Sequence, residues 1–212
     1  MGKIFCLIGK SGSGKDTLAK LLLQDKELDL QSVVPYTTRP MRDGEVRGVD
    51  YHFVSDTYMV EHRSSVIEVR GYETVNGQWI YCTMDDGQIW IDSLNWYLMI
   101  ATPESFKSLK GYFGEDIVVP LYIEVDDGIR LSRALGRERK SFRPNYCEMC
   151  RRFIADDKDF HTMILDRLGI KERYPNIHTA DCYLHLRTDI LADIKRAKEL
   201  SGTTPSLQPR EV

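Results

Sequence analysis

The feature that most constrains the fold of this chain is a glycine-rich segment near its start. The apolar run Ile4-Phe5-Cys6-Leu7-Ile8 predicts a buried strand over Lys3–Ile8, and Gly-Lys-Ser-Gly-Ser-Gly-Lys-Asp-Thr follows it over residues 9–17. An apolar helical pattern then starts near Thr17 and continues to Leu23. Strand, glycine-rich loop and helix in this order are typical of a phosphate-binding loop. The sequence therefore predicts an α/β chain that binds a nucleoside triphosphate.

Each residue of this loop has an expected part in holding the triphosphate. Glycines let the backbone turn tightly and point its N–H groups at phosphate oxygens, at the positive end of the following helix. The ammonium group of Lys15 can reach the β- and γ-phosphates. The expected phosphate-binding residues are Gly9, Lys10, Ser11, Gly12, Ser13, Gly14, Lys15, Asp16 and Thr17.

Asp16 departs from the usual pattern, in which Ser or Thr follows the lysine and ligates Mg²⁺. A carboxylate is also a hard oxygen ligand, so Asp16 can hold Mg²⁺ directly or through water. The alternative is that Asp16 only complements the helix dipole in the first turn. The sequence leaves both roles open.

Composition places the chain among ordinary globular proteins. Its 212 residues are 42% hydrophobic and 29% charged, with a net charge of −3. This balance excludes a global electrostatic attraction to nucleic acid or to an anionic membrane. The sequence has neither a run long enough to span a bilayer nor a signal peptide, so we expect a cytoplasmic protein. The sequence does not decide its oligomeric state, and we expect a monomer or a homodimer.

Five cysteines argue against a complete disulfide framework. Cys147, Cys150, His178 and Cys182 can be drawn as a zinc site, although their spacing is unlike that of common zinc modules. The alternative is that Cys147 and Cys150 are neighbours on one face of a helix.

Apolar strands alternate with amphipathic helices, which predicts a parallel sheet flanked by helices. Further strands are expected over Ser32–Tyr36, Trp96–Ala101, Val118–Val125 and, at an edge, Cys182–Leu186, with helices over Glu104–Tyr112 and Thr188–Leu200. One domain over residues 1–200 is expected, followed by a disordered tail over 201–212. Its parts are a core (1–36, 91–130 and 155–200), a β-rich insert (37–90) with turns at Asp43-Gly44 and Asn76-Gly77, and an arginine-rich helical lid (131–154) with a mobile segment over Gly136–Pro144.

A second signature identifies a resemblance. Residues 37–45 read T-T-R-x-x-R-x-G-E, and residues 48–53 read G-x-D-Y-x-F. Together with the phosphate-binding loop, these motifs resemble guanylate kinases, which move the γ-phosphoryl group of ATP to GMP. The resemblance runs from residue 1 to about residue 165. It implies a P-loop kinase fold, with the β-rich insert as the acceptor-binding lobe, and Mg²⁺ as cofactor.

The resemblance also implies site residues. The acceptor phosphate is expected to bind Arg39, Arg42, Tyr51 and Tyr81, because guanidinium forks and phenol O–H groups suit a phosphate. Glu68 and Thr83 match the residues that read guanine. Pro35 replaces a base-contacting serine, and the strand that ends in aspartates in the family ends here in Ala101-Thr102. Phosphoryl transfer is therefore a firmer expectation than GMP as the acceptor.

The arginine-rich segment resembles the lid of the same family. Arg133, Arg137 and Arg152 match arginines that close on the triphosphate, although a solvated helix face would place arginines similarly. With Lys15 and Arg39, Arg137 and Arg152 are the expected catalytic residues, since positioning and charge neutralisation drive phosphoryl transfer.

Three functions remain open at this point. The first is an ATP- and Mg²⁺-dependent nucleoside monophosphate kinase acting on GMP. The second keeps the chemistry with another acceptor, a deoxynucleotide or ribose bisphosphate, because the Gly-Lys-Asp form of the loop also resembles such kinases. The third is a guanylate-kinase-like module that binds a phosphorylated ligand without catalysis.

Overall fold

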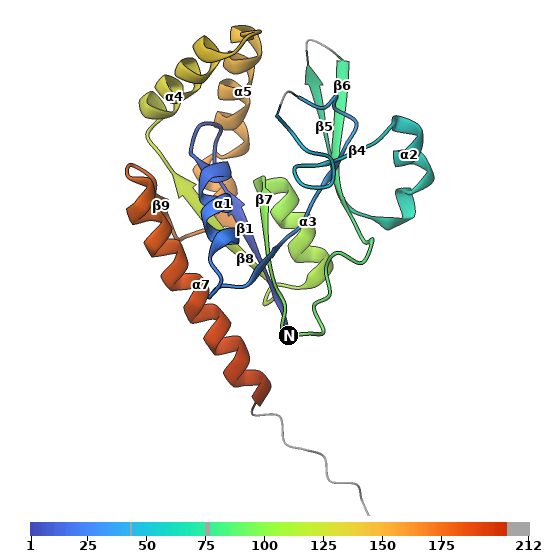
Figure 1. Cartoon of the computed structure of the whole chain (residues 1–212), viewed down its shortest axis with the longest axis vertical. Helices are drawn as coiled ribbons and strands as arrows, with labels where there is room; N and C mark the ends of the chain where they lie inside the picture. The colour runs from blue at the N-terminus through green and yellow to red at the C-terminus, as the bar shows by residue number, and fades with distance from the viewer. Residues whose placement is uncertain (43, 75–76, 203–212) are drawn as a thin grey trace, which may run out of the picture.

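The computed structural model describes residues 1–42, 44–74 and 77–202. Its centre is a parallel sheet of five strands in the order β2-β7-β1-β8-β9 (Figure 1). These strands are β1 (Lys3–Ile8), β2 (Leu30–Ser32), β7 (Trp96–Ala101), β8 (Val118–Glu124) and β9 (Tyr174–Pro175). The predicted α/β class is confirmed, and the glycine-rich loop leaves the carboxyl end of the central strand β1.

Helices cover both faces of this sheet. Side chains of a strand alternate between the two faces, so each face carries apolar side chains that pack against a helix layer. Phe5 and Leu7 of β1 pack with α1 (Lys15–Gln24) and α7 (Thr179–Gly202). Ile4, Cys6 and Ile8 pack instead with α3 (Pro103–Phe113) and with Leu165 of α6 (Thr162–Arg167). Thr102 caps α3, since its hydroxyl accepts from the N–H of Ser105. The result is a three-layer core.

A second, smaller sheet stands beside the first (Figure 1). Its order is β4-β3-β6-β5, from β3 (Tyr36–Thr37), β4 (His52–Phe53), β5 (Val66–Thr74) and β6 (Gly77–Met84). The helix α2 (Asp56–Glu61) and the short 3₁₀ helix Arg63–Ser65 lie between β4 and β5. Tyr36, Met59, Cys82 and Met84 form a separate apolar cluster in this lobe.

A helical hairpin rises over the glycine-rich loop. Its helices are α4 (Asp127–Lys140) and α5 (Tyr146–Asp159). Asp126 caps α4 by accepting from the N–H groups of Gly128 and Ile129, and Asn145 caps α5 by accepting from that of Glu148. Gly136, expected in a mobile segment, lies inside α4, which ends only at Lys140. Among the helices of the described residues, none has the length and apolarity that a membrane span requires.

Two strand predictions are wrong. The expected strand Ser32–Tyr36 is divided, with Ser32 ending β2 in the main sheet and Tyr36 beginning β3 in the small one. Residues Cys182–Leu186 belong to α7, where the buried side chains of Cys182, Leu186 and Ile190 follow helical spacing. The edge strand beside β8 is β9 instead, and β2 forms the opposite edge.

Parts of two predicted turns and most of the predicted tail lie outside the described residues. These are Asp43 of the Asp43-Gly44 turn, Asn76 of the Asn76-Gly77 turn, and residues 203–212. Ser201 and Gly202, which we expected in the tail, form the end of α7.

Candidate active site

The glycine-rich loop has the backbone conformation that its glycines permit. Gly12 and Gly14 have φ angles of 81° and 90°, a region that other L-residues rarely adopt. A Cβ atom on Gly14 would lie 2.5 Å from Nδ2 of Asn176, and one on Gly12 would lie 2.9 Å from the carbonyl oxygen of Arg130. Both positions therefore require glycine for conformation, and Gly12 requires it also for space against the backbone of Arg130.

Lys15 is folded back onto its own loop. Its Nζ donates hydrogen bonds to the carbonyl oxygens of Gly9 at 2.6 Å and Lys10 at 3.1 Å. Burial lowers the pKa of Lys15, while the nearby carboxylates of Asp16 and Asp156 act in the opposite direction. The ammonium group is thus kept within the loop by neutral carbonyl groups, from which a phosphate can draw it.

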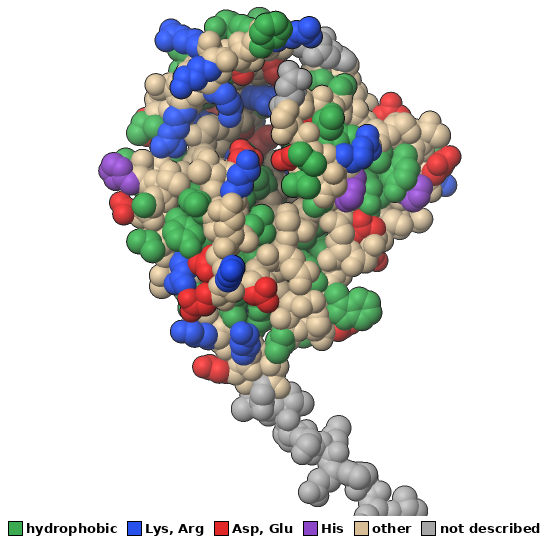
Figure 2. Space-filling view, in the orientation of Figure 1, with side chains coloured by type: hydrophobic (Ala, Val, Ile, Leu, Met, Phe, Trp, Pro, Cys, Tyr) green, Lys and Arg blue, Asp and Glu red, His purple; other side chains and the backbone are tan. Residues whose placement is uncertain are grey.

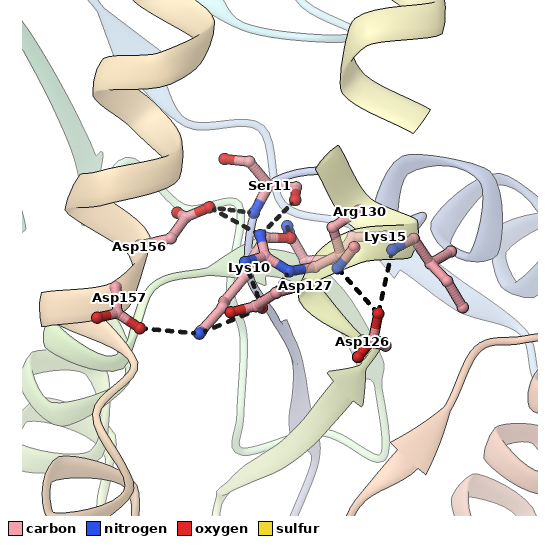
Figure 3. Close-up of polar contacts among 10 residues, drawn as sticks. Lys10, Ser11, Lys15, Asp126, Asp127, Arg130, Asp156 and Asp157 are labelled. Carbon is pink, nitrogen blue, oxygen red and sulfur yellow. Dashed lines mark hydrogen bonds and ion pairs between the residues drawn. The ribbon is translucent and has the colours of Figure 1, made fainter. Parts of the chain in front are cut away.

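An acidic side chain from the helical hairpin contacts the same loop (Figure 3). Oδ2 of Asp156 in α5 accepts from the backbone N–H of Ser11 at 2.7 Å. Arg130 in α4 donates through Nη1 to the carbonyl oxygen of Ser11 at 2.8 Å and to Asp156 at 3.3 Å. Arg130 is 1% exposed, and its guanidinium also pairs with Asp127 at 2.7 Å. These bonds join the loop to both helices of the hairpin.

Lys10 adds an outer layer of charge to this contact. Its Nζ lies 3.6 Å from Asp127 and 3.5 Å from Asp157, whose side chain is largely exposed. Exposed ion pairs of this kind contribute little to stability. Lys10 therefore bridges α4 and α5 in the present conformation, and its ammonium remains available to an anion.

A cleft of about 880 Å³ connects the loop to the small sheet. Figure 2 shows this face hollowed between the helical hairpin and the small lobe, with lysine and arginine side chains gathered around the hairpin. The cleft is lined by predicted phosphate-binding residues at one end and by predicted acceptor-binding residues at the other. From both sets its lining includes Gly9, Ser11, Lys15, Asp16, Arg39, Arg42, Tyr51, Tyr81 and Arg152.

Arg39 is held firmly at the acceptor end of this cleft. It pairs with Glu45 in bidentate fashion, at 3.0 Å and 2.7 Å, and its Nε donates to the phenol oxygen of Tyr81 at 3.0 Å. The guanidinium also lies 5.2 Å from the centre of the Tyr51 ring. Arg39, Tyr51 and Tyr81 thus form one cluster, with Glu45 as the anionic partner of the arginine.

Arg42 and Arg152 supply positive charge with less compensation. Burial, and then the like charges of Arg152 and Arg39, lower the pKa of Arg42. Arg152 donates to Glu148 at 2.8 Å, and Glu148 also pairs with Arg151. Hydrogen bonds from Arg151 and Arg152 lower the pKa of Glu148 to about 2. Glu148 therefore holds both arginines at the edge of the cleft, where Arg152 is close enough to Arg42 to lower its pKa.

The two predicted guanine readers lie deeper than expected. Glu68 and Thr83 are 3% and 1% exposed and form a hydrogen bond of 2.9 Å with each other. Both are outside the residues that line the cleft, whereas Arg70, which pairs with Glu68 at 3.0 Å and 3.2 Å, lines it. The guanidinium of Arg70 thus lines the cleft where the resemblance implied the carboxylate of Glu68.

The remaining predicted residues are placed as follows. Arg133 donates to the carbonyl oxygen of Asn176 at 3.0 Å and lies outside the cleft lining. Arg137 is exposed and also outside that lining, although its charge contributes to lowering the pKa of Lys15. Thr17 is exposed on α1. Ser13 is buried, and its Oγ lacks a hydrogen-bond partner within the described part of the chain.

The zinc site that the sequence allowed, from Cys147, Cys150, His178 and Cys182, does not form in the structure. Cys147 and Cys150 are exposed on α5, whereas Cys182 is buried in α7 with its Sγ directed at the carbonyl oxygen of Tyr174. Across residues 1–42, 44–74 and 77–202, no three histidine, cysteine or acidic side chains are arranged to hold a metal ion. Helical neighbours on α5 remain the explanation of the Cys147–Cys150 spacing.

Sequence reasoning missed four residues that shape this site. Arg130 carries a buried charge, Arg70 lines the cleft, Asp156 binds the loop, and Asn176 donates to the carbonyl oxygen of Ser13 at 2.7 Å. For Arg130 the arginine-rich segment was a visible signal, but its helical pattern did not distinguish a buried arginine from a solvated one. Asn176 follows the two-residue strand β9, which is too short to give an apolar run in the sequence.

Comparisons with known proteins match part of the sequence and most of the fold. Residues 1–76 match the family model for guanylate kinase. The guanylate kinase of Shewanella sp. (strain MR-7) is 42% identical over 71 residues, 34% of this chain and 32% of that protein. The guanylate kinase of Helicobacter hepaticus is 30% identical over 116 residues, 54% of this chain and 56% of the relative. The matches span about a third to about half of these relatives.

A solved structure extends the likeness to the whole fold. The crystal structure of guanylate kinase from Anaplasma phagocytophilum superimposes with a TM-score of 0.60 and 17% sequence identity. The match covers 91% of this chain and 86% of that one. The likeness in fold thus continues well beyond residue 76, where sequence similarity to the family model ends.

Proposed function

We propose that this chain is a guanylate kinase family member that transfers the γ-phosphoryl group of ATP to a nucleoside monophosphate, which the family match of residues 1–76 and the likeness in fold support. GMP is the leading acceptor. One observation carries this proposal: a single cleft is lined by Lys15 and its loop at one end and by Arg39, Arg42, Tyr51 and Tyr81 at the other. Two anion-binding clusters facing one cleft suit a donor and an acceptor that both carry phosphate.

The residues have distinct parts in this reaction. Backbone N–H groups of the loop and Lys15 bind the β- and γ-phosphates, and Arg39 and Arg42 hold the acceptor phosphate in line with the transferred group. The acceptor oxygen is already largely anionic near neutral pH, so the reaction proceeds without a general base. Arg152, with Arg137 after closure of the hairpin, neutralises the charge that spreads over the moving phosphoryl oxygens.

Substrate binding requires several site residues to exchange a hydrogen-bond partner within the protein for a phosphate oxygen close by. Lys15 gives up the carbonyl oxygens of Gly9 and Lys10 for phosphate oxygens, and Asp156 releases the N–H of Ser11. At the other end, the acceptor phosphate takes part of the place of Glu45 on Arg39. Each exchange replaces one hydrogen-bonding partner by another, so the cost in free energy stays small.

Mg²⁺ fits this site as a shared ligand of protein and phosphates. The exposed carboxylate of Asp16 lies at the cleft directly after Lys15, and one or two carboxylates completed by phosphates and waters suit this ion. Asp16 is the residue that would hold the metal, which supplies charge neutralisation at the β- and γ-phosphates. We expect Asp16→Ser to keep Mg²⁺-dependent activity and Asp16→Ala to raise the Mg²⁺ concentration needed for half-maximal rate.

Two alternatives follow from the departures in the acceptor region. The same chemistry on a deoxynucleotide or on ribose bisphosphate is favoured by the pairing of Glu68 with Arg70, which leaves the expected guanine reader engaged. A module that binds a phosphorylated ligand without catalysis is disfavoured by the intact loop geometry around Lys15. A cytoplasmic location and a monomeric or homodimeric state are expectations within the leading proposal.

A coupled ADP-release assay tests the proposal. The full chain is supplied with ATP and Mg²⁺ and with GMP, dGMP, AMP, UMP, CMP, dTMP or ribose 1,5-bisphosphate, and Lys15→Ala serves as the inactive control. We expect the highest kcat/KM with GMP or dGMP. Turnover with ribose 1,5-bisphosphate alone would replace the acceptor in this proposal, and ATP binding without turnover on any acceptor would favour the binding module.

A further inference from the structure

The carboxylate of Glu68 is saturated by its own neighbours. Its Oε2 accepts from Nε of Arg70 at 3.0 Å, and its Oε1 accepts from Nη2 of Arg70 at 3.2 Å and from Thr83 at 2.9 Å. The side chain of Glu68 is 1% exposed. A ligand in the cleft therefore meets Arg70 before it meets Glu68, and the carboxylate acts on the ligand only through the arginine that it orients.

Arg70 presents a fixed cationic fork to the acceptor end of the cleft. Its side chain is 12% exposed and lines the cleft together with Tyr72, Trp79 and Tyr81. The two bonds to Glu68 use two of the five N–H donors of a guanidinium, and the phenol of Tyr72 also interacts with Arg70. Terminal N–H donors remain for a ligand, beside aromatic side chains that offer stacking surface to a base.

A guanidinium and a carboxylate recognise different edges of a purine base. A carboxylate accepts from donors such as N1–H and the 2-amino group of guanine. An arginine fork donates to the O6 and N7 acceptors of guanine, whereas adenine presents a 6-amino donor in place of O6. Hypoxanthine shares O6 and N7 with guanine and lacks the 2-amino group, so the two kinds of reader rank GMP and IMP differently.

We propose that Arg70, positioned by Glu68, is the base-reading residue of this cleft and selects 6-oxopurine nucleotides through O6 and N7, with little regard to the 2-amino group. The inference rests on the proposed kinase function and specifies its substrate class. Two other positions near the base support it, because neither offers a free group to read a base. Pro35 lacks an N–H donor, and the hydroxyl of Thr102 is engaged in capping α3. The other candidate reader is Asp159 at the end of α5, an exposed carboxylate that also lines the cleft.

The test compares kcat/KM for GMP, IMP, 7-deaza-GMP and AMP with the unmodified full chain, ATP and Mg²⁺. We expect GMP and IMP to agree within about threefold, and 7-deaza-GMP to fall by about tenfold through loss of one acceptor. AMP should be about 100-fold poorer or worse, because its 6-amino group faces a cation. An IMP value more than about 30-fold below that of GMP would overturn the inference, since a carboxylate would then be reading the 2-amino group.

Variants assign the effect to a residue. Arg70→Ala should lower kcat/KM for GMP and IMP in parallel, by about 5- to 150-fold, with the KM for ATP unchanged. Because this change leaves Glu68 buried without its cation, the double variant Glu68→Gln with Arg70→Met provides a neutral pair for the same measurement. Asp159→Asn is the matched control and should leave the ratio of GMP to IMP unchanged. If Asp159→Asn alone removes a preference for GMP over IMP, Asp159 is the reader and Arg70 is not.

The two proposals fail in distinguishable ways. Robust GMP turnover with strong discrimination against IMP would contradict the role of Arg70 and leave the kinase function intact. Absence of turnover with every nucleotide would overturn the kinase function, and the role of Arg70 with it.

Discussion

Asp156 in α5 accepts a hydrogen bond of 2.7 Å from the backbone N–H of Ser11, so a carboxylate lies on a donor that the glycine-rich loop would offer to a phosphate. The same carboxylate is close enough to Lys15 to influence its pKa. The carboxylate of Asp156 and a triphosphate would therefore compete for the same donor, so nucleotide binding requires Asp156 to release the N–H of Ser11.

Removing the charge of Asp156 should strengthen nucleotide binding. We expect Asp156→Asn to bind ATP about 3- to 10-fold more tightly in the absence of Mg²⁺, because the amide is a weaker competitor for the Ser11 N–H. Isothermal titration calorimetry in EDTA measures the change. Asp157→Asn is the matched control. Asp157 is next in sequence, and within the described residues its side chain bonds to Lys10 at 3.5 Å and not to the N–H of Ser11. Equal gains in both variants would indicate a general charge effect instead.

Lys15 should be needed for turnover far more than for binding of the acceptor. We expect Lys15→Ala to lower kcat by about 100-fold or more, as for loss of one donor that stabilises transition-state charge. Its affinity for GMP, measured by calorimetry, should stay within about twofold, because the acceptor cluster lies at the other end of the cleft. A variant with normal kcat would remove Lys15 from the reaction.

The charge around Arg42 should serve acceptor binding. Burial and the like charges of Arg152 and Arg39 lower the pKa of Arg42, so an anionic ligand relieves repulsion there. We expect Arg42→Ala to raise the KM for the acceptor about 10- to 100-fold with kcat changed less. Arg143→Ala, in an exposed residue between α4 and α5, is the control and should leave the KM unchanged. An unchanged KM in Arg42→Ala would exclude Arg42 from the acceptor cluster.

Glu148 gives the protein a defined sensitivity to acid. Hydrogen bonds from Arg151 and Arg152 lower the pKa of Glu148 from 4.5 to about 2. A carboxylate with a depressed pKa in the folded state stabilises the fold above pH 4.5, and this contribution is lost as the pH falls towards 2. We therefore expect the Tm to fall less steeply between pH 5 and pH 2.5 in Glu148→Gln than in the unmodified protein.

The control for this experiment is Glu61→Gln, at an exposed position at the end of α2. Its pH profile should follow that of the unmodified protein. If the slopes of Glu148→Gln and the unmodified protein coincide, the ion pairs of Glu148 do not persist in solution.

Local sequence patterns predicted the parts of the site that are continuous in the chain. The loop over residues 9–17 and the strands β1, β7 and β8 were evident because apolar runs and glycine spacing encode them directly. The strand β9 has two residues and the helix α7 is longer than its apolar pattern at Thr188–Leu200 suggested. Short strands and helix starts depend on tertiary contacts, which local patterns do not carry.

Pairings between side chains explain most of what the sequence left out. Glu68 and Arg70 are two positions apart on β5 and so share one face of the strand, but only the structure shows that the carboxylate turns inward and the guanidinium lines the cleft. Asp156 and Ser11 are separated by 145 residues, and no motif links them. Contacts of this kind decide which member of a charged pair meets a substrate.

The position of β1 in the sheet has a consequence for how the chain acquires its nucleotide site. Within the described residues, β1 pairs with β7 and β8, which both lie beyond residue 76, whereas β2, its near neighbour in sequence, pairs with β7 instead. The stretch that matches the family model thus holds only two strands of the main sheet, β1 and β2, and these do not bond to each other. During synthesis the glycine-rich loop stays without its scaffold until residue 124 has left the ribosome. A fragment ending at residue 76 would carry the recognisable motif and have no site.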